Sequence, residues 1–107
     1  MPPNKEIIAT VRQFAQGLLD DNGYEADLDN YNKFEAYIGD NGCVNYNVYL
    51  DGVDDGKVVK IAIEIKYDAK PEADKGHYVP DLIWQQLRVD DEVIIDELNA
   101  AYDRNRR

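Results

Sequence analysis

The sequence predicts an α+β domain in which two helices cover one face of a three-stranded antiparallel sheet. Two stretches, 43–50 and 59–67, alternate apolar and polar residues with the period of two that a half-buried strand requires. Apolar residues at helical spacing precede these strands at 7–19 and follow them at 83–102. Packing both helical stripes on the single apolar face of the sheet gives a two-layer α-β-β-β-α sandwich.

The totals of the sequence predict a single domain that spans residues 1–107. A chain of this length buries roughly 65% of the surface of its unfolded state, which is enough for a stable core without disulfides or bound metals. Its one cysteine, Cys43, rules out an internal disulfide and favours a reducing, cytoplasmic location. The start of the chain has no apolar run of signal-peptide length, and no window approaches the roughly 18 apolar residues of a membrane span. We therefore expect a cytoplasmic protein that makes no membrane contact.

The first element is an amphipathic helix that begins after Asn4 and ends before Gly23. Asn4 is a good N-cap because its side-chain oxygen can accept a hydrogen bond from the first turn. Gly23 favours termination because glycine adopts the left-handed conformation without a steric penalty. Asp20 and Asp21 fall in the last turn, where the helix dipole disfavours negative charge by about 0.3–1 kcal/mol each. These two acids therefore indicate either a turn role or a need for negative charge at this position.

The sheet is predicted as an antiparallel meander of three strands, near 34–38, 43–50 and 59–67. Tyr24–Leu28 also alternates and is either a fourth, edge strand or an extended loop. Turns rich in Gly, Asp and Asn separate the strands. The period of two leaves one face of the sheet open. We expect this face to carry Glu35, Tyr37, Asn45, Asn47, Tyr49, Lys60, Ala62, Glu64 and Lys66.

The C-terminal part is predicted as a loop over 68–79, followed by helix after Pro80. Apolar residues return at helical spacing between Ile83 and Tyr102. Asp90, which is followed by two more acids, is a favourable helix N-terminus. We interpret the segment as one helix kinked near Asp90 or as two helices.

The one catalysis-like motif is Glu64-x-Lys66 on the third strand. The motif and the α-β-β-β-α order resemble the core of the PD-(D/E)xK nucleases, over residues 5–104 in element order but only Glu64 and Lys66 in motif. The resemblance implies a divalent metal held by Glu64 and by an Asp of the preceding strand, with Lys66 helping to activate water. We place Asn45 opposite Glu64, and an amide is a weak substitute for the second carboxylate that a dication needs. We therefore predict no catalytic residue, metal or cofactor, and keep a metal-dependent nuclease as an alternative.

The charge of the chain indicates the class of its partner. Acidic residues outnumber basic residues by 22 to 12, so the net charge is −10. Coulomb repulsion disfavours direct contact with nucleic acid or an anionic membrane, whereas a basic protein surface is attracted. Solubility explains the same acidity equally well.

We predict a small non-catalytic binding protein, an inhibitor that occupies the basic surface of a nucleic-acid-processing enzyme. Phage-encoded anti-defence proteins and toxin-immunity proteins act in this way, and the analogy rests on size, charge and the lack of a catalytic set. An acidic chaperone for a basic client is a further alternative, and the oligomeric state stays open. Spaced carboxylates can imitate a phosphate backbone, while tyrosine and asparagine suit a recognition surface. The predicted partner-binding residues are Tyr37, Asn45, Asn47, Tyr49, Asp51, Asp54, Asp55, Glu64, Asp90 and Asp91.

Overall fold

The computed structural model describes residues 3–39, 42–68, 71–72, 77–78 and 81–98. The elements in these ranges are α1 (Lys5–Asp21), β1 (Lys33–Ile38), β2 (Cys43–Asp54), β3 (Lys57–Asp68), β4 (Pro71–Glu72), β5 (His77–Tyr78), β6 (Asp81–Val89) and β7 (Glu92–Leu98).

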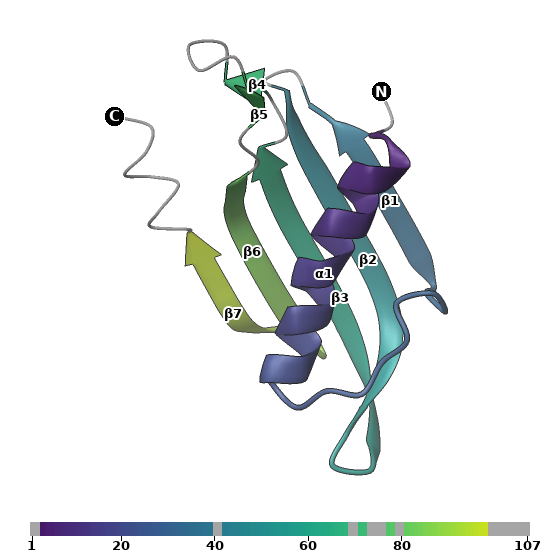
Figure 1. The fold of residues 1–107 in the computed structure, drawn as a ribbon. Helices are drawn as coiled ribbons and strands as arrows, with labels where there is room; N and C mark the ends of the chain where they lie inside the picture. The colour runs from purple at the N-terminus through teal and green to yellow at the C-terminus, as the bar shows by residue number, and fades with distance from the viewer. Residues whose placement is uncertain (1–2, 40–41, 69–70, 73–76, 79–80, 99–107) are drawn as a thin grey trace.

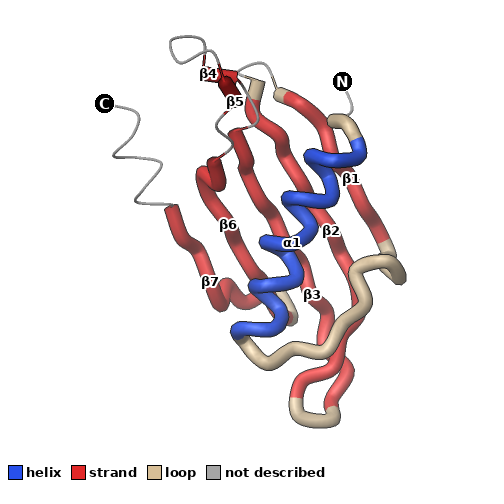
Figure 2. The backbone as a smooth tube through the Cα atoms, in the orientation of Figure 1, coloured by secondary structure: helices blue, strands red, loops and turns tan. Residues whose placement is uncertain are grey.

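Five strands form one antiparallel sheet in the order β1-β2-β3-β6-β7. The short strands β4 and β5 pair with each other inside the segment that was predicted as a loop. α1 lies diagonally across one face of the large sheet, and the tube in Figure 2 shows the loop that leads from α1 to β1 (Figure 1). The fold is therefore α+β, as the sequence predicts, with one helix and a larger sheet in the described residues.

α1 begins and ends where the sequence predicts. Asn4 Oδ1 accepts a hydrogen bond from a backbone nitrogen of the first turn at 2.9 Å and so caps the helix. Beyond the helix, Gly23 has a φ of +78°, which is the left-handed conformation. The last turn contains no basic residue, and Asp20 Oδ1 accepts a hydrogen bond from Gln16 Nε2 at 2.9 Å. Asp20 and Asp21 are thus exposed carboxylates at the end of the helix.

The core lies between α1 and the sheet face that it covers. The helix contributes Val11, Ala15, Leu18 and Leu19. The strands contribute Val44, Tyr46, Val48, Leu50, Val59, Ile61, Ile63, Ile65, Tyr67, Leu87 and Val89. Complete burial of one aliphatic side chain stabilises the fold by roughly 1.5–3 kcal/mol, so this layer dominates the stability. The covered face predicted from the alternation of residues 44–65 is confirmed.

β2 and β3 form a hairpin that is longer than predicted. All twelve residues of each strand pair, and the last pair before the turn is Asp54 with Lys57. The turn consists of Asp55 and Gly56, whose φ values of +51° and +78° are those of a type I′ turn. The right-handed twist of this turn type matches the twist of the strands, which lets them remain paired up to the turn.

The tip of this hairpin projects beyond the rest of the sheet (Figure 1). β1 pairs with β2 only as far as Tyr49, and β6 pairs with β3 only from Ile61 onward. The loop after α1 holds the tip, because Glu25 N donates to Val53 O at 2.9 Å and Val53 N donates to Glu25 O at 2.7 Å. Tyr24–Leu28 therefore forms a loop with a single bridge and not a fourth strand.

The second predicted helix is wrong, because β6 and β7 occupy the segment in which it was expected. Asp90 and Asp91 form a two-residue turn with φ values of +50° and +66°, a conformation that aspartate tolerates better than most residues. The register shifts leave Ile83 of β6 and Ile94 of β7 without a partner residue, as in β-bulges. Each bulge moves apolar residues out of the period of two, and their spacing then imitates that of a helix. Tyr102, also assigned to this helix, lies outside the described residues.

Candidate functional site

We call the sheet face that α1 leaves uncovered the open face. Its side chains are aligned in rows across the strands. The first row is Tyr37, Asn45, Lys66, Trp84 and Leu98; the second is Glu35, Asn47, Glu64, Gln86 and Asp96; the third is Lys33, Tyr49, Ala62, Arg88 and Val93; the last is Asp51 and Lys60. All nine residues predicted for this face lie in these rows.

Asn45 was predicted to lie opposite Glu64. This prediction is wrong, because Asn47 lies opposite Glu64. The two-residue turn of the hairpin fixes this register and places Asn45 opposite Lys66. On its other side Glu64 lies next to Gln86, so neither adjacent strand offers a carboxylate across from it. Within the described ranges, no group of three or more His, Cys, Asp or Glu side chains could hold a metal ion. The strands β6 and β7 also remove the element order on which the nuclease resemblance rested.

A polar cluster joins β6 to β7 on the open face. The carboxylate of Asp96 accepts hydrogen bonds from Trp84 Nε1 at 2.7 Å and from Gln86 Nε2 at 3.1 Å. Lys66 Nζ lies 5.7 Å from the centroid of the Trp84 ring. This part of the face is therefore held in one arrangement before any partner binds.

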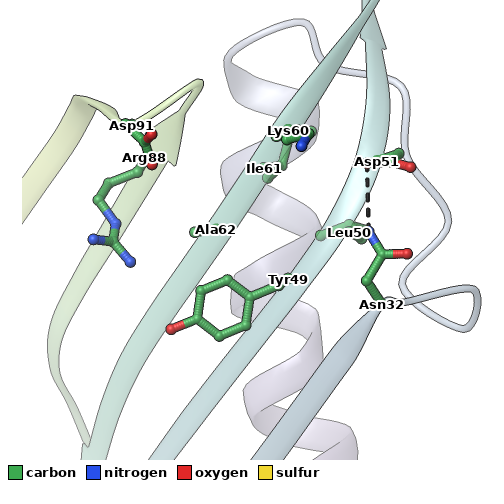
Figure 3. Close-up of a pocket in the computed structure, with 9 residues that line it drawn as sticks. All are labelled: Asn32, Tyr49, Leu50, Asp51, Lys60, Ile61, Ala62, Arg88 and Asp91. Carbon is green, nitrogen blue, oxygen red and sulfur yellow. Dashed lines mark hydrogen bonds between the residues drawn. The ribbon is translucent and has the colours of Figure 1, made fainter.

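A hollow of about 340 Å³ opens on this face near its lower end (Figure 3). It is lined by Asn32, Tyr49, Leu50, Asp51, Lys60, Ile61, Ala62, Arg88 and Asp91. Ala62 leaves the space because its methyl group stands between the longer side chains of Tyr49 and Arg88 in the same row. Asn32 borders the hollow by donating to Asp51 Oδ1 at 3.4 Å, the dashed contact in Figure 3.

The open face carries both signs of charge although the chain is strongly acidic. The four rows above contain four basic and four acidic side chains, Asp51 among them, and the pair Cys43–Asp68 continues the same face with one more acid. The basic ones are Lys33, Lys60, Lys66 and Arg88. The acidic ones are Glu35, Asp51, Glu64 and Asp96. The excess negative charge must therefore lie mainly elsewhere on the molecule.

Much of that charge gathers at one end of the sheet, which we call the acidic end. The end of α1, the loop after it, the β2–β3 turn and the β6–β7 turn all lie there (Figure 1). Its exposed acidic residues are Asp20, Asp21, Glu25, Asp27, Asp29, Asp51, Asp54, Asp55, Asp90, Asp91 and Glu92. The β6–β7 turn is fastened to β3, because Asp90 N donates to Lys60 O at 2.8 Å and Lys60 N donates to Asp90 Oδ1 at 2.9 Å.

The pKa of Tyr24 reflects how closely these segments approach one another. Burial raises the pKa of Tyr24 above its ordinary value of 10.0, and the charges of Asp54, Glu92 and Asp90 raise this pKa further. Carboxylates from two separate hairpins thus act on one hydroxyl group. The one ion pair between described residues joins Arg12 to Asp29 at 3.0 Å. The other carboxylates of the acidic end therefore form no ion pair with a described residue, although Lys60 and Lys57 lie across the hairpin from Asp51 and Asp54.

The predicted partner-binding residues fall into two groups. Asp51, Asp54, Asp55, Asp90 and Asp91 come together at the acidic end. Tyr37, Asn45, Asn47, Tyr49 and Glu64 lie on the open face. The row of Tyr37 lies four residues along the strands from the row of Tyr49, a separation of about 13 Å. The structure therefore presents two adjoining surfaces of different charge.

Sequence reasoning missed the open-face residues of β6 and β7. Trp84, Arg88 and Asp96 were assigned to a helix, so they had no place on the sheet. The signal that could have found them is the Asp90-Asp91 pair directly after the alternating stretch Gln86–Val89, because such a pair suits a two-residue hairpin turn.

In the part of the chain that the structure describes, no helix has the length and apolar character to cross a bilayer. Comparison with known proteins found no matching family model, no matching curated protein and no matching solved structure.

Proposed function

We propose that this protein acts without catalysis, by laying its acidic end against the basic surface of another protein. The partner that suits this chemistry best is an enzyme that processes nucleic acid, because its substrate groove must attract phosphate groups. Occupation of the groove by the acidic end would inhibit the enzyme. The proposal includes a cytoplasmic site of action.

The observation that carries this proposal is the convergence of the acids from four segments. Asp20, Asp54 and Asp90 lie far apart in the sequence, yet the fold brings their segments to one end of the sheet. Acids retained only for solubility would be spread over the whole surface, since dispersion depends on net charge. Here acids far outnumber bases at the acidic end, whereas the rows of the open face contain both signs of charge. The distribution therefore favours a directed electrostatic role.

The backbone holds these charges in defined positions. Asp55, Asp90 and Asp91 occupy left-handed turn positions, which few residues other than Gly, Asn and Asp accept readily. Duplex DNA carries a phosphate charge every ~1.7 Å along its axis, and a basic groove is built to neutralise a dense array of this kind. Carboxylates fixed on two hairpin turns and a helix end offer such an array without flexible linkers.

The test compares two variants of equal net charge. The first replaces Asp54, Asp55, Asp90 and Asp91 with Asn, which removes four charges from the acidic end and keeps residues that tolerate the left-handed turns. The control variant replaces Glu6, Glu35, Glu72 and Glu97 with Gln, all of them outside the acidic end. Each protein serves as bait in a native extract, and the captured nucleic-acid enzyme is assayed for inhibition.

We expect the wild type and the control variant to inhibit the captured enzyme, and the acidic-end variant to lose at least tenfold in affinity. Association should also slow as salt shortens the Debye length to about 8 Å at physiological ionic strength. Equal losses in both variants would show that only net charge matters. Capture of no enzyme whose activity falls would reject the inhibitor role.

A further inference from the structure

The hollow on the open face brings two cationic side chains together on an acidic protein. Lys60 and Arg88 line it, with Asp51 and Asp91 on its rim. Lys33 Nζ lies 5.9 Å from the centroid of the Tyr49 ring, which forms one wall. Arg12, by contrast, forms an ion pair with the carboxylate of Asp29 at 3.0 Å.

Neither Lys60 nor Arg88 makes a side-chain hydrogen bond or an ion pair with any described residue. This is unexpected where acids outnumber bases so strongly. Arg88 is also half-buried as a residue, and its guanidinium group forms no ion pair with a described carboxylate. We propose that the hollow binds the carboxylate of a ligand, held between Arg88 and Lys60 above the methyl group of Ala62.

The register gives this site a suitable size. Tyr49, Ala62 and Arg88 are neighbours in one row, so Tyr49 and Arg88 flank Ala62 from strands about 10 Å apart. Lys60 precedes Ala62 by two residues on the same face, about 7 Å along β3. Figure 3 shows the Tyr49 ring extending from β2 toward β3, which places its hydroxyl group on the hollow side. The residues that carry a guanidinium group, an ammonium group and a phenol therefore occupy neighbouring positions around Ala62.

The surroundings favour a carboxylate over other charged groups. A cation would be repelled by Lys60 and Arg88. A phosphate dianion loses more hydration free energy than a carboxylate on entering the hollow, and two cations with Asp51 and Asp91 on the rim compensate that loss less well. The planar fork of an arginine also matches a carboxylate with two parallel hydrogen bonds. The volume of about 340 Å³ accommodates a short acidic side chain or a small free acid.

This inference goes beyond the proposed function, since it concerns an anionic ligand at a site beside the acidic end. The experiment titrates the isotopically labelled full chain with three probes and follows its amide and Arg Nε–H resonances. The first probe is glutamate blocked at both ends, which presents only its side-chain carboxylate. Blocked glutamine has the same shape without the charge. Sodium acetate represents a free small acid.

We expect saturable shifts at Ala62 and at the Arg88 Nε–H with blocked glutamate, and none with blocked glutamine. Tighter binding of blocked glutamate than of acetate assigns the site to an acidic side chain of a partner protein. Equal binding assigns it to a free carboxylate, and both results support the site. Inorganic phosphate that binds more tightly than either acid would overturn the choice of carboxylate.

Matched variants separate the hollow from general charge. Arg88→Gln and Ala62→Leu should each weaken binding at least tenfold, the first by removing the fork and the second by filling the space. Lys57→Gln removes one cation from the β2–β3 turn outside the hollow and should leave binding unchanged. Should Arg88→Gln not fold, Lys60→Gln replaces it in the comparison. Binding that survives in these variants, or that falls equally in Lys57→Gln, contradicts the proposal.

Discussion

Trp84 Nε1 donates a hydrogen bond of 2.7 Å to Asp96 Oδ1, across the pair of strands β6 and β7. The second oxygen of the same carboxylate accepts from Gln86 Nε2 at 3.1 Å. One charged side chain of β7 thus engages two side chains of β6. Most side chains of β7 are exposed. The hydrogen bonds of Asp96 therefore make a large part of the side-chain contribution that holds β7 against β6.

Replacing Asp96 with Ala should loosen β7 and expose the indole. Hydrogen bonds to a charged group contribute about 1.5–3 kcal/mol each in protected sites and less on an exposed face, so we expect a loss of about 1–2 kcal/mol. Trp84 is the single tryptophan, and its fluorescence emission should therefore shift to the red in the folded variant. Glu97→Ala is the control, because its contact with Gln85 is long, at 3.4 Å. Identical emission and urea midpoints in both variants would disprove the role of the contact.

An introduced carboxylate should unfold the protein on the covered face of β3 and be tolerated on its open face. Ile63 is 1% exposed in the core, and Ile63→Asp would bury an unpaired carboxylate at a cost of several kcal/mol. This variant should be unfolded by circular dichroism. Ala62→Asp places the same charge on the open face beside Arg88 and should change stability by less than about 1 kcal/mol. A folded Ile63→Asp variant together with an unfolded Ala62→Asp variant would invert the assignment of the faces.

Gly52 should be intolerant of any side chain. A Cβ atom at this position would meet Ile61 Cδ1 and lie 2.9 Å from the backbone oxygen of Glu25 in the bridged loop. Gly52→Ala should therefore destabilise the fold by about 1–3 kcal/mol in urea denaturation. Gly17 in α1 has open space around it, and Gly17→Ala should stabilise the helix by about 0.5–1 kcal/mol. Equal effects of the two substitutions would argue against close approach of the loop to β2.

Stability should fall at alkaline pH through Tyr46. Burial is the main cause that raises the pKa of this tyrosine above its ordinary value of 10.0. The native state then holds a proton that the unfolded state releases, so the contribution is complete below about pH 10 and disappears as pH rises through the native pKa. Urea denaturation of Tyr46→Phe should match the wild type within about 1 kcal/mol near pH 8, because the edge-on contact with Phe34 needs no hydroxyl.

Above pH 10 the two proteins should diverge, with the Tyr46→Phe variant losing less stability than the wild type. Parallel loss in both would show that another group dominates the alkaline transition.

The sequence revealed the elements whose local signals agree with their tertiary surroundings. Asn4 and Gly23 marked α1 because capping is a local property. The hairpin was visible because residues 44–50 and 59–67 alternate between apolar and polar side chains. β6 and β7 were hidden because the bulges at Ile83 and Ile94 are set by pairing with another strand, and a period search cannot see them.

The candidate site was predictable only in part for the same reason. Alternation along β2 and β3 placed Tyr49 and Glu64 on the open face correctly. Which residue lies opposite Glu64 depends on which two residues form the turn. The prediction took a longer link as the turn, and this shifted the register by two residues, from Asn47 to Asn45. Arg88 could not be placed beside Ala62 until its strand was known. The clustering of acids at one end results from the fold and cannot be read from the amino-acid composition.

The projecting tip of the β2–β3 hairpin should also exchange its amide hydrogens faster than the rest of the sheet. Near Ile63 each strand has neighbours on both sides, whereas beyond Gly52 the ribbon has only itself and the bridge from Glu25. Opening the tip breaks few contacts, so deuterium uptake should rise steadily from Ile63 toward Asp55. Local opening of the protein should therefore begin at this tip, while the sheet beneath it stays closed.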